Sequence, residues 1–157
     1  MRNIYYYKTS IGNVCFEDNG KAITNAYLLK NEIINEEFLN ESDLIKKAKK
    51  ELDEYLEGTR KDFDIKLEPE GTEFQRNVWN ALIKIPYGKT ASYSEIANII
   101  KNPKAVRAVG GANNKNPIFI FIPCHRVIGI DGSMIGYAGG IKLKKHLLNI
   151  EKNNTNS

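Results

Sequence analysis

Short apolar segments separated by turn residues dominate the first third of the chain. Three of them are rich in aromatic and β-branched side chains, which favour strands over helices: residues 4–9, 13–16 and 22–29. Between the second and third segments, Asn19-Gly20 predicts a type I′ hairpin turn, because both residues tolerate the positive φ angles that this turn requires. The pattern therefore predicts a small antiparallel meander.

One amphipathic helix follows the meander. Apolar side chains recur every three or four positions over residues 42–57, so they share one helical face. Ser42 can cap the start of this helix and Gly58 can end it. The acidic, Asn-rich residues 31–41 predict a loop or a weak helix, and residues 59–71 predict a connector. Three strands and one helix bury a small core, so this part is expected to need a neighbouring domain.

Two helix starts are recognisable in the second half of the chain. Thr72 with Gln75, and Ser92 with Glu95, fit capping boxes, in which two residues satisfy each other's free backbone N–H groups. The first of these helices is expected to bury a face formed by Phe74, Val78, Trp79, Leu82 and Ile83. The second is expected to run through the apolar positions up to residue 100.

A third helix is predicted after a short break. Asn102 is expected to cap it, with Pro103 at its first position, and it runs toward Gly110. Two short helices joined by a tight turn, the second small and basic, are typical of a helix-turn-helix. Helix pairs of this kind also occur in ordinary protein cores, so both interpretations stand at this point.

The two halves of the chain have opposite net charges, which the small net charge of the whole chain conceals. The 157 residues include 23 Lys and Arg and 19 Asp and Glu, a net charge of +4. Residues 1–70 carry 11 basic and 15 acidic side chains (−4), whereas residues 71–157 carry 12 and 4 (+8). A basic half is either a solvated surface or a surface that meets a polyanion such as nucleic acid.

The composition excludes several other classes. No stretch of eighteen apolar residues is present, so no membrane helix is expected, and the first residues lack the apolar core of a signal peptide. The two cysteines are then expected to be reduced thiols in a cytoplasmic protein. No metal site is expected, because the soft ligands lack paired spacing: Cys15, Cys124, His125 and His146.

Cys124 is the strongest candidate for chemistry. It follows the apolar run 118–122 and Pro123, and His125 comes directly after it. A thiol reacts as the thiolate, so a nucleophilic cysteine needs a base or a positive field nearby. Because adjacent residues rarely point the same way, a water between Cys124 and His125 is the easier geometry. Cys15, between Val14 and Phe16, is expected to be a small core residue.

A series of motifs runs in order through the second half. They are Ile85-Pro86-Tyr87-Gly88-Lys89-Thr90, residues 102–112, Ile122-Pro123-Cys124-His125-Arg126-Val127, residues 136–140 and residues 144–151. Together they resemble the O6-alkylguanine-DNA alkyltransferases, that is, the methylated-DNA–protein-cysteine S-methyltransferases. The resemblance extends over residues 72–151. Asn113, Asn114 and Lys115 depart from it, since other members often carry a different mix there, sometimes with a larger apolar residue.

The resemblance implies an α+β fold of two parts. Residues 1–70 would form an N-terminal ribonuclease H-like domain with a three-stranded antiparallel sheet and a helix. Residues 71–157 would form a C-terminal winged-helix-like domain that carries the helix-turn-helix and the alkyl-transfer site. The polar residues 152–157 are expected to be a disordered tail.

The family's activity, carried over by this resemblance, is direct DNA repair. The alkyl group would move irreversibly from O6 of guanine, and less readily from O4 of thymine, to Cys124, once per protein molecule. The damaged base must first be flipped out of the duplex. His125 would act as a base through a water, Glu151 would orient it, Asn116 would brace the Cys124 turn, and Tyr93 would donate a proton and aid flipping.

Further contacts are implied for the DNA and the base. Arg107 would be the finger that fills the gap left by the flipped base. The other implied DNA contacts are Tyr93, Lys104, Ala105, Ala108, Gly110 and Asn114, and the pocket would be lined by Val127, Tyr137 and Ala138. The partner would be duplex DNA containing O6-alkylguanine, bound by a monomer, with cooperative assembly along DNA left open. No cofactor is expected, because the damaged DNA supplies the alkyl group.

Two other functional classes compete with this interpretation. A DNA-binding regulator of the same fold would have no need of Cys124 beside His125. A cysteine hydrolase or thiol transferase would need an oxyanion hole and a base from elsewhere in the chain, which would have to be His146. The hydrolase would also have no use for a basic helix-turn-helix.

Overall fold

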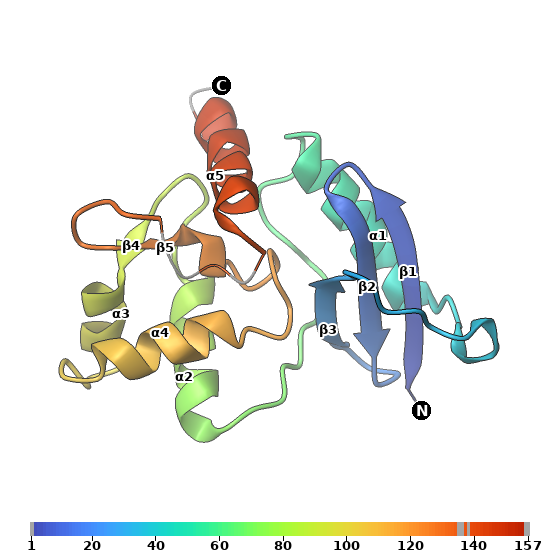
Figure 1. Cartoon of the computed structure of the whole chain (residues 1–157), viewed down its shortest axis with the longest axis horizontal. Helices are drawn as coiled ribbons and strands as arrows, with labels where there is room; N and C mark the ends of the chain where they lie inside the picture. The colour runs from blue at the N-terminus through green and yellow to red at the C-terminus, as the bar shows by residue number, and fades with distance from the viewer. Residues whose placement is uncertain (1, 135–136, 138, 156–157) are drawn as a thin grey trace. The chain divides into compact units, whose positions relative to one another are not determined.

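The computed structural model describes residues 2–134, 137 and 139–155, and the chain divides into two compact units, residues 1–70 and 71–157. In the N-terminal unit, three strands form one antiparallel sheet in chain order, and α1 (Asp43–Leu56) covers one face of it (Figure 1). The strands are β1 (Asn3–Thr9), β2 (Gly12–Asp18) and β3 (Ile23–Leu28). A short 3₁₀ turn, η1 (Glu36–Phe38), precedes the helix. The predicted sheet and helix are therefore confirmed.

The helix of this unit begins and packs as its sequence predicts. Ser42 caps α1 by accepting a hydrogen bond from Ile45 N at 3.1 Å. The apolar face of α1 is buried through Ile45, Ala48, Leu52 and Tyr55, and the sheet contributes Val14, Cys15, Phe16 and Ala26 to the core. Cys15 is fully buried, as expected for a core residue.

The turn between β2 and β3 differs from the predicted type I′. Gly20 has a positive φ of 90°, but Asn19 does not, and a type I′ turn needs both. The turn is held instead by the buried Asp18 carboxylate, which accepts a hydrogen bond from Gly20 N at 2.8 Å. Asp18 also accepts hydrogen bonds from Asn3 Nδ2 (2.8 Å) and from the Ser42 hydroxyl. One carboxylate therefore ties β1, the turn and the start of α1 together.

This arrangement predicts a large effect of a single substitution. Asp18→Ala should lower the free energy of unfolding by roughly 2–4 kcal/mol, because it leaves several buried donors without their acceptor. Urea denaturation followed by circular dichroism measures the change. The exposed Asp62→Ala should stay within about 0.5 kcal/mol of the wild type. An equal effect of the two substitutions would show that Asp18 does not organise this unit.

The C-terminal unit is mainly helical. α2 (Glu73–Ile83), α3 (Tyr93–Ile99) and α4 (Val106–Asn114) pack together, and α5 (Ile141–Thr155) lies above them in Figure 1. β4 (Ala91–Ser92) and β5 (Val127–Ile128) form a short parallel pair, and a 3₁₀ turn, η2 (Cys124–Arg126), precedes β5. Both predicted capping boxes are present, at Thr72 and at Ser92. None of the described helices is long and apolar enough to span a membrane.

Two local predictions for these helices are wrong. Ile83 is 47% exposed, and the buried face of α2 is formed instead by Val78, Trp79, Ala81 and Leu82. α4 begins at Val106 with Ala105 as its N-cap, so Asn102 and Pro103 lie outside it.

The end of α3 explains the late start of α4. Lys101 adopts the left-handed conformation (φ 62°) and donates its N–H to Asn98 O, while Asn102 N donates to Ala97 O at 2.9 Å. These two hydrogen bonds close α3 in a Schellman motif. Asn102 is therefore used to end one helix and does not cap the next.

The predicted disordered tail is also wrong for residues 152–155, which continue α5. Asn154 Nδ2 donates to Ile150 O at 2.7 Å, and the Thr155 hydroxyl donates to Glu151 O at 2.5 Å. Thr155 also packs so closely against Gly88 that a Cβ on this glycine would lie 2.2 Å from its hydroxyl oxygen. Packing against the turn at Gly88 thus holds the last turn of the helix in place. Residues 156 and 157 lie outside the described residues.

Candidate active site

The chain that leads into Cys124 follows a tightly bent path. Phe121 N donates to Phe119 O at 2.8 Å, and Ile120 between them has a φ of 69°. A β-branched residue rarely adopts a positive φ, and such strain costs on the order of 1–3 kcal/mol. A second tight turn follows, in which Cys124 N donates to Ile122 O at 2.7 Å. Cys124, the candidate nucleophile, therefore stands at the end of a bent and strained segment.

Asn116 forms hydrogen bonds with both ends of this segment. Its Oδ1 accepts a hydrogen bond from Ile118 N at 3.0 Å, and its Nδ2 donates to Ile122 O at 2.7 Å. The same side chain lies close enough to the Cys124 thiol to lower its pKa. The amide thus holds both ends of the bend next to the sulfur.

Cys124 is buried, with 4% of its surface exposed. Burial raises the pKa of the thiol to about 11, although the hydrogen bond from Asn116 and the charge of Lys144 act in the opposite direction. The sulfur is therefore an uncharged thiol at neutral pH. It needs a group that removes its proton when it reacts.

His125 is completely buried, and its Nε2 lies 2.6 Å from Glu151 Oε2. Burial lowers the pKa of His125, so the imidazole is neutral at neutral pH. Because an ionised carboxylate can only accept hydrogen bonds, the Nε2 atom carries the ring proton and donates it to Glu151. The Nδ1 atom then carries the lone pair that can accept a proton. The structure contains this His125–Glu151 hydrogen bond. In the sequence, only the family resemblance suggested that the two residues pair.

Glu151 is the centre of a larger network. It accepts hydrogen bonds from Arg126 Nε (2.8 Å) and Nη2 (3.2 Å) and from Gly88 N (3.0 Å). Arg126 also donates to Ile85 O at 2.7 Å. Burial raises the pKa of Glu151, but His125 and Arg126 outweigh this effect and lower it to about 2. Arg126 is permanently charged, so it keeps Glu151 ionised even while His125 is neutral.

Lys144 is a site residue that sequence reasoning missed. It is fully buried on α5, and its Nζ donates to Val127 O at 2.5 Å. Burial lowers the pKa of Lys144, whereas the nearby Cys124 raises it. A signal was present in the sequence, because Lys144, Leu147 and Glu151 share the spacing of one helical face. A positive charge here favours the anionic form of the sulfur.

Two predicted site tyrosines, Tyr93 and Tyr137, lie close enough to Cys124 to interact with it electrostatically. Tyr93, at the start of α3, is partly buried, and burial together with Cys124 raises the pKa of its hydroxyl. Tyr137 is 8% exposed, and burial and Cys124 raise its pKa as well. Both phenols are therefore protonated at neutral pH. Val127 is fully buried beside Lys144, and Ala138 lies outside the described residues.

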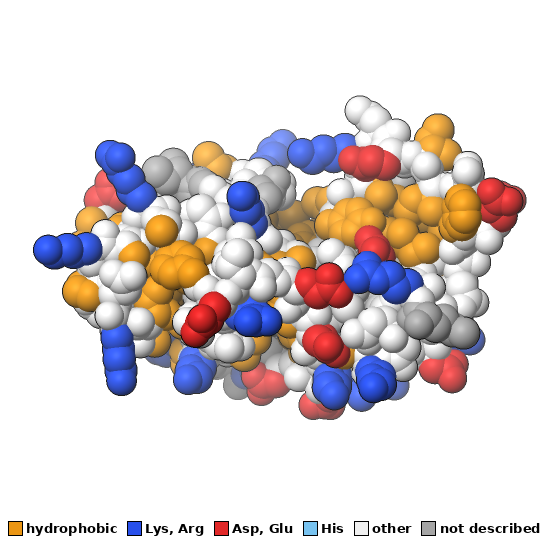
Figure 2. All heavy atoms as spheres, turned by 90° about the horizontal axis from the view of Figure 1, so that it is seen from below, with side chains coloured by type: hydrophobic (Ala, Val, Ile, Leu, Met, Phe, Trp, Pro, Cys, Tyr) orange, Lys and Arg blue, Asp and Glu red, His pale blue; other side chains and the backbone are white. Residues whose placement is uncertain are grey.

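Three of the seven predicted DNA contacts lie on the outer surface of α4. Arg107, Ala108 and Asn114 are exposed on α4, Lys104 is exposed just before it, and Ala105 is partly buried. Gly110 is turned inward, where a Cβ would lie 3.9 Å from the Tyr93 ring, whereas a Cβ on Gly111 would meet nothing. On the face drawn in Figure 2, Lys and Arg side chains project from the C-terminal unit.

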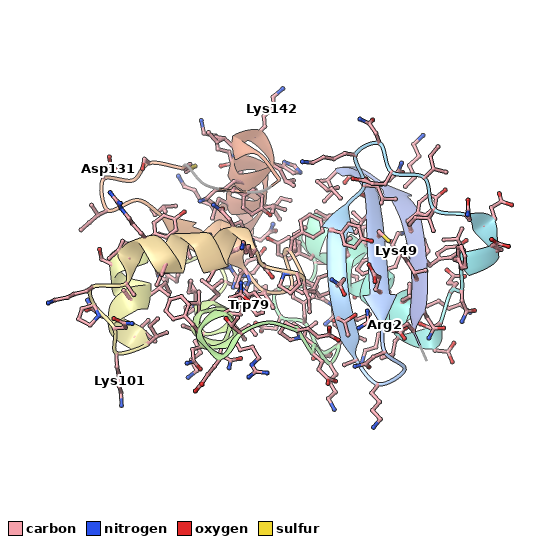
Figure 3. All side chains as sticks on the ribbon, turned by 60° about the horizontal axis from the view of Figure 1, so that its bottom comes forward. Arg2, Lys49, Trp79, Lys101, Asp131 and Lys142 are labelled. Carbon is pink, nitrogen blue, oxygen red and sulfur yellow. The ribbon has the colours of Figure 1, made fainter. Side chains whose placement is uncertain are left out.

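α4 is anchored from behind by α2. Trp79 is 2% exposed, and its Nε1 donates to Ala112 O at 2.9 Å, which satisfies a free carbonyl near the end of α4. Figure 3 shows Trp79 on α2 beneath α4. Among residues 2–134, 137 and 139–155, no cluster of three or more His, Cys, Asp or Glu side chains is arranged to hold a metal ion.

The fold and the site together define a helix-turn-helix protein with a candidate nucleophilic cysteine buried beside a His–Glu pair. Two family models match the chain: the DNA-binding domain of 6-O-methylguanine DNA methyltransferase over residues 73–153, and its ribonuclease-like domain over residues 4–69. The chain belongs to the 6-O-methylguanine DNA methyltransferase family.

Similar proteins extend over nearly the whole chain. A methylated-DNA–protein-cysteine methyltransferase of Methanosarcina mazei is 45% identical over 156 residues, which cover 96% of this chain and 99% of that protein. The crystal structure of an O6-methylguanine methyltransferase of Mycobacterium tuberculosis matches with a TM-score of 0.89 and 40% identity, over 98% of this chain and 94% of that one. A structure of Mycobacterium tuberculosis OGT in complex with DNA matches with a TM-score of 0.88 and 41% identity, over 97% and 94%.

The Glu151 network predicts a specific dependence of stability on pH. Because the pKa of Glu151 is lower in the folded protein than its ordinary value of 4.5, its stabilising effect is complete above pH 4.5 and is lost as the pH falls toward about 2. Glu151→Gln should therefore be less stable than the wild type at pH 7 by a few kcal/mol, and the gap should narrow between pH 4.5 and 2. Urea denaturation across this range measures both proteins. A gap that does not change with pH would contradict an ionised Glu151.

Proposed function

We propose that Cys124 is the alkyl acceptor in a direct DNA repair reaction. In this reaction the alkyl group on O6 of guanine in duplex DNA is transferred to the Cys124 sulfur. Alkyl transfer from DNA to a cysteine is the activity of the family. One observation supports Cys124 above all: its buried thiol is followed by a neutral His125 whose Nδ1 lone pair is fixed by the bond between Nε2–H and Glu151.

The reaction balances without a cofactor. The thiol proton passes through a water to Nδ1 of His125, and the sulfur lone pair attacks the alkyl carbon as the carbon–oxygen bond breaks. The electrons of that bond go to O6 of guanine, and a proton donated from the Tyr93 hydroxyl neutralises the leaving base. The proton held on His125 then returns to the Tyr93 phenolate, so both side chains end neutral. Lys144 favours the developing thiolate, and Arg126 acts only by holding Glu151. The carbon–sulfur bond of the thioether is stable, so each protein molecule reacts once.

The outer surface of α4 is the part that we assign to DNA. A base stacked in a duplex is out of reach of a buried sulfur, so the damaged nucleotide has to rotate into the pocket at a cost of a few kcal/mol. Arg107 is long, charged and exposed, so it can enter the space that the base leaves. The small side chain of Ala108 and the bare backbone at Gly111 let the duplex approach closely. O4-alkylthymine is a weaker substrate in this scheme, and a monomeric, cytoplasmic protein remains our prediction.

Intact-mass spectrometry tests the role of the cysteine. After incubation with a duplex that contains O6-methylguanine, the wild type should gain the mass of one CH₂ group on Cys124 and no more. Cys15→Ala should gain the same mass at the same rate, because Cys15 lies in the core of the other unit. Cys124→Ala should bind the duplex and gain nothing. Methylation of Cys124→Ala, or loss of reaction in Cys15→Ala, would refute the assignment.

Arg107→Ala tests the flipping step separately from the chemistry. Its rate with an O6-methylguanine duplex should fall by about tenfold to a hundredfold, because only the duplex needs a side chain in the gap. Its rate with free O6-methylguanine base should remain within about twofold of the wild type, since α4's outer surface does not contact a free base. Single-turnover rates by mass spectrometry give both values. Equal losses with duplex and free base would place Arg107 in the pocket rather than in the DNA.

A further inference from the structure

One lysine in the turn between α3 and α4 has a backbone conformation that few side chains favour. Lys101 has a φ of 62°, and Ile120 is the other non-glycine residue with a positive φ among residues 2–134, 137 and 139–155. Ile120 belongs to the bend that leads into Cys124. At the end of a helix, glycine or asparagine usually takes the left-handed position, because most other side chains crowd the backbone there. The lysine therefore calls for an explanation beyond the local backbone.

The side chain of Lys101 does not repay this strain through a contact within the protein. It is exposed, and its ammonium group forms no hydrogen bond or ion pair with any residue that the structure describes. No acidic residue occurs between Glu95 and Asp131. Lys84, at the end of α2, lines the same surface groove as Lys101, so a second positive charge lies nearby. Such a field favours an anion from outside the chain.

The turn that carries Lys101 leads directly into α4, whose outer surface we assign to DNA. Ala105 N donates to Asn102 O at 3.0 Å, so a tight turn separates Lys101 from Lys104. Lys104 and Arg107 are exposed as well. Figure 3 shows the Lys101 side chain at the tip of this turn, where it extends away from the unit. Three exposed cations therefore gather where α4 begins.

We propose that Lys101 binds a phosphate of the DNA backbone beside the part of the duplex that α4 contacts. Phosphates border both grooves of a duplex, and a lysine binds them whatever the base sequence. Glycine at this position would relieve the backbone strain but would supply no charge. The strained lysine thus exchanges some stability of the free protein for affinity toward DNA. This inference rests on the proposed function, from which it takes the DNA-facing surface of α4.

The salt dependence of DNA binding tests the phosphate contact. Fluorescence anisotropy gives the Kd for a labelled, undamaged duplex between about 50 and 200 mM NaCl. Lys101→Asn removes the charge but keeps a residue that tolerates the left-handed conformation. Its Kd at about 100 mM NaCl should rise roughly threefold to tenfold, and the slope of log Kd against log salt should fall by about 0.9, since one phosphate fewer releases its counterions. Lys101→Arg keeps the charge and should keep the wild-type slope.

Thermal unfolding separates this role from simple support of α3. A lysine at the negative end of a helix can stabilise it, although α3 has only seven residues. In that case Lys101→Asn would lower the Tm and leave the salt slope unchanged. We expect instead a Tm that is equal to that of the wild type or up to about 3 °C higher, because the strain is relieved.

Lys142→Asn is the matched control. It makes the same chemical change at an exposed position at the start of α5, which Figure 3 shows at the opposite end of the unit from Lys101. Its salt slope should equal that of the wild type, because the loss of a distant charge removes no phosphate contact.

Two results would overturn the inference. An unchanged salt slope in Lys101→Asn would mean that this lysine contacts no phosphate. An equal fall of the slope in Lys142→Asn would mean that the total charge governs binding rather than the place of Lys101. Methyl transfer is a separate measurement: a wild type that binds the duplex but takes no methyl group from O6-methylguanine would refute the proposed function alone, and the slopes would still decide the role of Lys101.

Discussion

The buried carboxylate of Glu151 is the interaction on which the reactive part of the protein depends. It pairs with three residues from two parts of the chain: Gly88 in the turn after α2, and His125 and Arg126 next to the nucleophile. An ionised group in an interior is costly unless it is paired and fully hydrogen-bonded, and Arg126 meets that condition. The network also explains the IPYG motif, because a side chain at Gly88 would collide with α5. Glu151 therefore both holds the turn at Gly88 and orients His125.

The same network decides what kind of nucleophile Cys124 is. A thiolate permanently buried in this cavity would carry a large desolvation cost, and burial accordingly raises the pKa of the thiol. The sulfur is instead kept neutral next to a base with a fixed tautomer and near the buried Lys144. In the proposed reaction, charge is then separated only when an alkyl carbon is in place to receive the sulfur's electrons. A protein whose one reactive sulfur can be alkylated only once benefits from a thiol that stays unreactive until the substrate is bound.

Structural features set by residues close together in the sequence could be predicted, whereas those set by residues far apart could not. Both capping boxes and the Ser42 cap were predictable, because each is set by residues three positions apart. The start of α4 was not, because a lysine rather than a glycine takes the left-handed position that ends α3. The last turn of α5 depends on Gly88, more than sixty residues away, so a polar composition alone suggested disorder.

The site shows the same division. The Cys–His dipeptide drew attention through local chemistry, and the family resemblance supplied Glu151, which otherwise looks like a charged residue at a helix end. The buried Lys144 was the harder case. Lysine is seldom buried, so the sequence alone suggests a surface position for it, and only the fold shows that Lys144 reaches Val127 O. Long-range pairing decides its role.

In the proposed function, α4 joins DNA recognition to the chemistry because its two faces have different roles. Its exposed face carries Arg107, Ala108 and Gly111, and its inner face lies against Tyr93 at Gly110 and against Cys124 at Asn113. A helix is stiff over nine residues, and the Trp79 hydrogen bond fixes the end nearest the sulfur. The distance from a bound duplex to the nucleophile is then set by the helix itself. A base can reach the sulfur only by leaving the stack. The reaction therefore requires the base to flip out of the duplex first.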